Sequence, residues 1–158
     1  MAHSLAELLS DFPPSHHAFH PTLVDGRYHY RHIGAGVRDD DRRGIFIILK
    51  PHPDGWIPDG RITLRKIEEK VSEIPRSPQA KRKPPFTAWT VEVTKKGTEK
   101  LNKGRTPDPN DYKHNRLGYA YSHADMHGLD VYLFGYPFNG FVYIRKSDEL
   151  LYTQTNRQ

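Results

Sequence analysis

The alternation of apolar and polar side chains is clearest over residues 86–96, which read FTAWTVEVTKK. The odd-numbered positions 89, 91 and 93 hold Trp, Val and Val, whereas the even-numbered positions from 88 to 94 hold Ala, Thr, Glu and Thr. A period of two predicts a β-strand with one buried face. On this register Glu92, Thr94 and Lys96 project from the same side, and the pattern predicts a polar face there.

Other segments also have strand patterns. Residues 27–33 alternate after an Asp-Gly turn, and residues 44–49 form a continuous apolar run, typical of a buried strand. We expect these two to pair as an antiparallel hairpin. Residues 129–134 and 141–144 are predicted to form a second hairpin around the turn at 135–140.

The hydrophobic period changes between residues 63 and 74. Apolar residues at 64, 67, 71 and 74 predict an amphipathic helix of about three turns, ended by Pro75. Short helices are also predicted over 4–10 and 147–151, each beginning at a serine N-cap. The pattern as a whole predicts an α+β fold: one compact domain, 1–158, with a mixed sheet of about five strands and flanking helices.

The remaining segments are predicted to be irregular. Residues 15–20, SHHAFH, lie between prolines, so we interpret them as a polar loop rather than a metal-binding helix. Residues 97–117 are polar, basic and without periodicity, and are expected to form a mobile loop that orders on a partner. Residues 153–158 are expected to be a frayed tail.

Composition restricts the functional classes. The chain has 158 residues and no cysteine, which excludes disulfides and thiolate zinc sites. The first fifteen residues lack a basic start and a long apolar run, and no apolar window is long enough for a membrane span. We therefore expect no membrane association and an intracellular protein, cytoplasmic or nucleoid-associated.

The positive charge is concentrated in one region. The net charge is +5, but residues 76–116 contain eleven Lys and Arg against four acids, a local net of +7. A local basic excess is typical of a nucleic-acid partner, most simply DNA. The alternative is a solvated loop whose lysines maintain solubility. The residues expected to contact phosphates are Lys81, Arg82, Lys83, Lys100, Lys103, Arg105, Lys113 and Arg116.

Residues 87–150 resemble the second half of PD-(D/E)XK nucleases, nearest to intron-associated homing endonucleases and resolvase-like enzymes. The resemblance lies in the order of a strand with an acid (Glu92), a basic loop, the segment YSHAD at 121–125, an apolar strand at 129–136 and an aromatic strand at 141–145 before a short helix. It implies a restriction-endonuclease-like fold and magnesium-dependent cleavage of DNA.

The resemblance also implies a catalytic set. Glu92 matches the acid of the acid-x-lysine pair, and Asp59, in a Pro-Asp-Gly turn, matches the first aspartate, so both would hold Mg²⁺. Thr94 stands where the family has lysine, so Lys95 or Lys96 would support the nucleophilic water. One cation can bridge the two carboxylates only when they lie within about 8 Å. An enzyme that cuts both strands is expected to be a homodimer.

Several alternatives stay open. Asp54 rivals Asp59, and Glu7 could supply the helical acid of such folds. Histidines at 114, 123 and 127, near aspartates at 125 and 130, belong either to a hydrolytic site or to the surface. The protein could instead be a non-catalytic DNA- or RNA-binding module that stacks bases on tyrosines at 112, 119 and 121. It could also be an accessory protein, for example a viral one, that binds an acidic protein partner.

Overall fold

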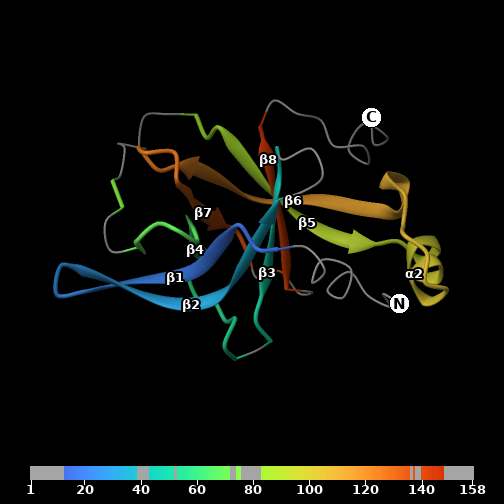
Figure 1. Ribbon diagram of the computed structural model, residues 1–158, viewed down its shortest axis with the longest axis horizontal. Helices are drawn as coiled ribbons and strands as arrows, with labels where there is room; N and C mark the ends of the chain where they lie inside the picture. Colours follow the sequence, from blue (N-terminus) through green and yellow to red (C-terminus); the bar gives the residue numbers. More distant parts are fainter. Residues whose placement is uncertain are drawn as a thin grey trace.

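The computed structural model describes residues 13–38, 43–51, 53–71, 74–75, 83–135, 137 and 140–147. Within these residues eight strands form one closed antiparallel barrel in the order β1-β2-β3-β8-β5-β6-β7-β4 (Figure 1). The strands are β1 His16–Val24, β2 Arg27–Arg38, β3 Ile45–Leu49, β4 Arg61–Lys66, β5 Phe86–Val93, β6 Tyr112–Ser122, β7 Gly128–Leu133 and β8 Phe141–Lys146. The predicted α+β fold with a mixed sheet is therefore wrong, because every strand pair is antiparallel and the barrel is mainly β.

The barrel consists of two halves that follow one another in the chain. Strands β4-β1-β2-β3 form one run of neighbours and strands β8-β5-β6-β7 form the other. Two seams join the halves: β3 pairs with β8, and β4 pairs with β7. Closure at both seams leaves the ring of described strands without an open edge.

The interior of the barrel is filled by one apolar cluster. An eight-stranded ring is just wide enough for side chains to fill it. Alternate residues of each strand point inward, and the largest fully buried apolar ones are Ile33, Ile47, Ile62, Leu64, Val131, Val142 and Ile144. Their immediate neighbours along each strand therefore point outward.

Several sequence-based strands are confirmed, but not all of their pairings. The predicted strands correspond to β2, β3, β5, β7 and β8, and β2 does pair with β3. The predicted hairpin of β7 with β8 is wrong, because β8 lies between β3 and β5. Strand order around a closed ring depends on contacts between distant segments, and turn signals do not carry that information.

The predicted helix over residues 63–74 is also wrong. Residues 61–66 form β4, which pairs with both β1 and β7. Ile62 and Leu64 fit the period of a strand, whereas Ile67, which would continue a helical stripe, is exposed. Pairing on both sides thus decides the conformation over a helical pattern that was matched by chance.

Two segments predicted to be irregular are regular instead. Residues 15–20 lie in or beside β1, with histidines pointing alternately inward and outward. The predicted mobile loop at 97–117 contains most of helix α2 (Lys95–Asn102), the 3₁₀ turn Pro109–Asp111 and the first half of β6. The predicted helix over 4–10 and the tail lie outside the described residues, as does the helix over 147–151 beyond Ser147.

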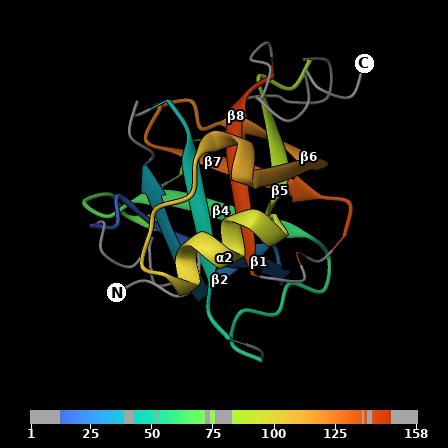
Figure 2. The same cartoon turned by 90° about the vertical axis from the view of Figure 1, so that its right-hand side faces the viewer.

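Helix α2 covers one end of the molecule, opposite the tip of the β1–β2 hairpin (Figure 1), and it crosses in front of the barrel when that end is viewed directly (Figure 2). The Thr94 hydroxyl caps the helix by accepting from the Gly97 N–H at 3.1 Å. Lys100 ties it to the following turn through Asp108 at 2.8 Å and Asp111 at 2.6 Å. No helix among the described residues has the length and apolar character that crossing a membrane requires.

Candidate functional site

The structure does not bring together the two acids expected to hold magnesium. Asp59, in the turn before β4, accepts from His20 Nε2 at 2.8 Å and from the Arg61 N–H at 3.1 Å. Glu92 is exposed on β5, opposite Lys113 of β6. Because β6 and β7 lie between β5 and β4, the strand that Asp59 precedes, three strand spacings of about 4.8 Å separate the two acids around the ring. One cation cannot bridge that separation.

The two acids also have ordinary roles. Partial burial opposes ionisation of Asp59, but the hydrogen bonds from His20 and the Arg61 N–H, together with the charges of these two residues, outweigh it and lower the pKa of that carboxyl. Glu92 faces a lysine across the sheet, which is a common cross-strand pair. Across the described residues, no three His, Asp or Glu side chains gather in a way that would hold a metal ion.

The predicted catalytic lysines belong to α2 rather than to the strand. Strand β5 ends at Val93, Thr94 is the helix N-cap, and Lys95 and Lys96 form the first turn. The expected common face of Glu92, Thr94 and Lys96 is therefore wrong, because the chain turns into a helix before it can continue the alternation.

The predicted phosphate contacts are distributed over several parts of the molecule. Lys81 and Arg82 lie outside the described residues, and Lys83 is exposed just before β5. Lys100 is held between two aspartates, whose hydrogen bonds raise the pKa of its amine. Lys103 and Arg105 are exposed beyond the end of α2, whereas Lys113 and Arg116 are exposed on β6. Arg116 lies over the ring of Phe134, with its guanidinium group 5.9 Å from the ring centroid.

A continuous row of aromatic side chains crosses the outside of the barrel. We call it the aromatic belt, and its members come from β1, β2, β6 and β7 with the residue after β7. Alternation places them outside, because their neighbours Ala18, Ala120 and Val131 point into the core. The belt consists of Phe19, Tyr28, Tyr30, Tyr119, Tyr121, Tyr132 and Phe134.

Ring contacts connect the members of the belt. On one side Tyr119 stacks on Tyr132 with centroids 5.4 Å apart and lies 6.0 Å from Phe134. On the other side Tyr30 lies 6.2 Å from Tyr28 and 6.2 Å from Phe19. Such distances are typical of favourable aromatic pairs, so the rings support one another.

Arg61 joins the two sides of the belt. It lies at the start of β4, and its guanidinium group is 5.6 Å from the Tyr132 ring and 5.8 Å from the Tyr28 ring. Burial disfavours its charge, but a hydrogen bond with Tyr28 and the neighbouring rings raise the pKa of Arg61, which stays protonated. With Arg116 over Phe134, the belt carries a fixed cation at its centre and another at one end.

Exposure varies along the belt in a way that suits a binding surface. Phe134 is 67% exposed and Tyr28 is also exposed, whereas Tyr119 and Tyr132 are half-buried and Tyr121 is buried. The buried rings hold the exposed ones in place. Phe134 is supported by Tyr119 and Tyr28 by Tyr30, so their exposed faces offer platforms on which a planar group can stack.

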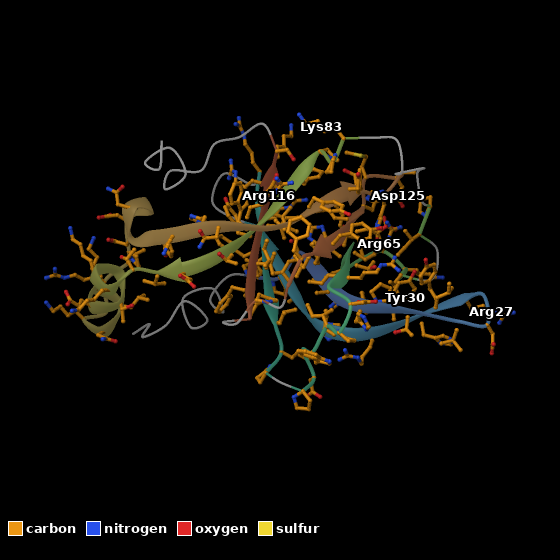
Figure 3. All side chains as sticks on the ribbon, turned by 180° about the vertical axis from the view of Figure 1, so that it is seen from behind. Arg27, Tyr30, Arg65, Lys83, Arg116 and Asp125 are labelled. Atoms are coloured by element: carbon orange, nitrogen blue, oxygen red, sulfur yellow. The ribbon has the colours of Figure 1, made fainter. Side chains whose placement is uncertain are left out.

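A buried polar network lies beside the belt on β4 and β7. The Arg65 side chain is 3% exposed and donates twice to Asp125, at 2.9 and 2.6 Å (Figure 3). The Arg65 guanidinium also lies 3.1 Å from His123 Nδ1, which can only accept from it, and His123 Nε2 lies 3.3 Å from Asp130. The Thr63 hydroxyl donates to the same Asp130 oxygen at 3.2 Å.

This network holds the 123–128 turn against β4 and does not form a reaction centre. His123 and Asp130 are almost completely buried, so no substrate reaches them. The Arg65 guanidinium holds the pKa of the Asp125 carboxyl well below its usual range. The sequence groups the histidine with both aspartates, but the predicted helix over 63–74 leaves Arg65 out of this group, which the pairing of β4 with β7 brings it into.

The belt itself has a sequence signal. Aromatic residues recur two positions apart at 28 and 30, at 119 and 121, and at 132 and 134. Such spacing places pairs of rings on one face of a strand. Sequence reasoning used the pair at 119 and 121 and missed the other two.

Comparisons of the chain with family models, curated proteins and solved structures give no match.

Proposed function

We propose that this protein binds single-stranded nucleic acid on the aromatic belt. The observation that carries this proposal is the continuity of the belt: two exposed rings, Phe134 and Tyr28, stand at either side of supporting tyrosines, with Arg61 between them and Arg116 at one end.

The chemistry of the belt suits bases and phosphates together. Every base offers a flat π-face, and stacking on an aromatic side chain contributes about 1–3 kcal/mol per base with little sequence preference. The Arg61 and Arg116 guanidinium groups lie beside the rings, where they can contact phosphates or stack on bases. A duplex keeps its base faces covered, so a belt of this kind favours a single strand.

Magnesium-dependent cleavage receives less support. A nuclease site needs acids that share a cation, and Asp59 and Glu92 lie on opposite sides of two intervening strands. Binding by stacking needs neither acid. Plasmid nicking in Mg²⁺ that disappears in Glu92→Ala would favour the nuclease instead.

The test compares the belt with the α2 end of the molecule. Fluorescence anisotropy with labelled oligo-dT and oligo-U at low salt should show binding by the wild-type chain. Phe134→Ala should weaken it about tenfold or more, because one stacking platform is lost. Phe134 is mostly exposed, so this substitution should leave folding intact, which circular dichroism checks.

The matched control is Lys103→Ala with Arg105→Ala. Both are exposed cations at the α2 end, and both were expected from the sequence to contact phosphates. We expect a change smaller than that of Phe134→Ala. Unchanged affinity in Phe134→Ala together with lost affinity in the control would move the site to α2. Binding to a neutral oligosaccharide rather than to the oligonucleotides would contradict a nucleic-acid ligand.

A further inference from the structure

Strands β1 and β2 extend beyond the barrel as a two-stranded ribbon. β1 pairs with β4 only over His16–Phe19, and β2 pairs with β3 only over Gly34–Arg38. Past those ladders, residues 20–24 and 27–31 pair with one another alone among the described strands. Figure 1 shows the resulting hairpin, here called the ribbon, projecting from one end of the molecule.

The ribbon has two different faces. Residues directly opposite in an antiparallel pair share a face, so Leu23 and Tyr28 lie together, as do Pro21 and Tyr30. This face continues the aromatic belt. The other face carries the pairs Thr22 with His29 and Val24 with Arg27.

The tip of the ribbon is apolar and exposed. Leu23 is 59% exposed and Val24 is 46% exposed, and both lie at the end of β1 just before the turn. The turn itself is Asp25-Gly26, with φ of 51° and 76°, which is the conformation of a tight hairpin. Arg27 follows at the same tip (Figure 3). Leu23 and Val24 thus expose apolar side chains on the two faces of a projecting tip.

The ribbon is fixed in its direction. The Arg31 guanidinium donates to the backbone carbonyls of Asp54 and Trp56 in the loop before β4. His20 bonds to Asp59 in the same loop at 2.8 Å, and Arg61 lies beneath Tyr28. The tip is thus presented in one orientation, which reduces the entropy that binding must overcome.

We propose that the ribbon inserts its tip into a duplex next to a single strand held on the belt, so that the preferred ligand is a junction between single- and double-stranded nucleic acid. This inference rests on the proposed function of the belt. Leu23 and Val24 act as a wedge between base pairs, a role that apolar side chains have in proteins that unstack DNA. A two-stranded ribbon has the width that a groove admits, and Arg27 supplies a phosphate contact at the tip.

The aromatic belt and the ribbon form one continuous surface, which supports a single ligand that contacts both. Tyr28 belongs to the belt and to the ribbon, and it contacts Arg61, which also contacts Tyr132. A strand that leaves its duplex at the tip would meet the belt rings within a few nucleotides. Of the charged residues within the ribbon, Arg27 and Arg31 are cations and Asp25 is the one acid, which favours a polyanion.

The experiment measures affinity for three labelled ligands at one salt concentration: a single strand, a blunt duplex and a hairpin with a single-stranded tail. We expect the tailed hairpin to bind at least about tenfold more tightly than the single strand. Leu23→Ser with Val24→Ser should remove that preference and weaken single-strand binding less than Phe134→Ala does, because Leu23 lies beside Tyr28 but is not itself a stacking platform. Met126→Ser, which changes another exposed apolar side chain away from the ribbon, is the control and should keep the preference.

The outcomes separate the two proposals. Equal affinity of the wild-type chain for tailed hairpin and single strand, or a preference retained in the tip variant, would overturn the junction inference while the belt stands. No binding to the single strand would overturn the belt and the inference with it. Binding to anionic phospholipid vesicles that the tip variant loses, without a junction preference, would make the tip a membrane contact and would also overturn the inference.

Discussion

Arg65→Met is the substitution that most directly tests the buried network on β4. Methionine keeps the apolar stem of the side chain but removes the guanidinium group. The two bonds to Asp125 are lost, as is the bond to His123 Nδ1. The strand pairing of β4 stays intact, because residue 65 bonds to β1 and β7 through its backbone.

The expected loss of stability follows from what remains behind. Breaking a buried ion pair by removing one partner costs about 3–5 kcal/mol. Asp125 is 28% exposed and can recover part of its hydration, which moves the value to the low end of that range. His123 is completely buried, and an acceptor left without its donor costs about 1–3 kcal/mol. Both costs describe partners that the same substitution leaves unpaired, so they overlap rather than add, and we expect a total loss of about 3 kcal/mol.

Urea denaturation followed by circular dichroism measures this loss. A change of about 3 kcal/mol should lower the midpoint by about 1–2 M and the Tm by about 6–12 °C. Asp125→Asn should lose much of the same interaction, so the double variant should be less destabilised than the sum of the single variants. Lys113→Met, which removes an exposed cation on β6, should change stability by less than about 1 kcal/mol. A loss below about 1 kcal/mol for Arg65→Met would show that the network does not stabilise the barrel.

Two further predictions concern pH and helix packing. Burial lowers the pKa of His16, and likewise that of His114, to about 4 in the folded chain. In the unfolded chain the pKa of a histidine is about 6.5, so the unfolded chain takes up these protons first. Acidification from pH 7 to 5 should therefore reduce the free energy of unfolding by about 1–2 kcal/mol per histidine. Replacing both by Gln should flatten that dependence, whereas the contribution of Asp125, whose pKa is depressed, is lost only below about pH 4. Gly97→Ala should destabilise α2 by about 1–3 kcal/mol although alanine favours helices, since its Cβ would lie 2.6 Å from Val93 and 2.9 Å from Asp111. Hydrogen exchange of the α2 amides should rise in Gly97→Ala but not in Thr98→Ala, and equal exchange in the two variants would contradict the packing argument.

The sequence predicts the fold only where the hydrophobic pattern of a strand's own residues is enough to identify it. The alternating residues of β5 and the apolar run of β3 are such cases, and both strands exist. Segment β4 satisfied a helical period as well as a strand period, and only its two neighbours in the barrel decide between them. Strand β1 was hidden because histidines and prolines are poor strand indicators, although its backbone pairs on both sides.

The candidate site was accessible to sequence reasoning only in part. Tyr119 and Tyr121 were expected to stack on bases, and they belong to the belt. Tyr132 comes from the next strand, β7, whereas Tyr28 and Arg61 come from β2 and β4, which are distant in sequence, and the order of the ring brings them together. The same order separates Asp59 from Glu92. Long-range pairing thus determines which side chains share a surface, and it leaves no local trace in the sequence.

The belt crosses the seam between β4 and β7, where the two halves of the barrel meet. Arg61 and Tyr28 belong to the first half, and Tyr132 belongs to the second. A ligand spread over these residues holds both halves at once, so its binding free energy adds to the free energy that keeps the ring shut. A ligand bound to the belt therefore stabilises the closed barrel, and it opposes both the opening of the seam and the exchange of halves between molecules.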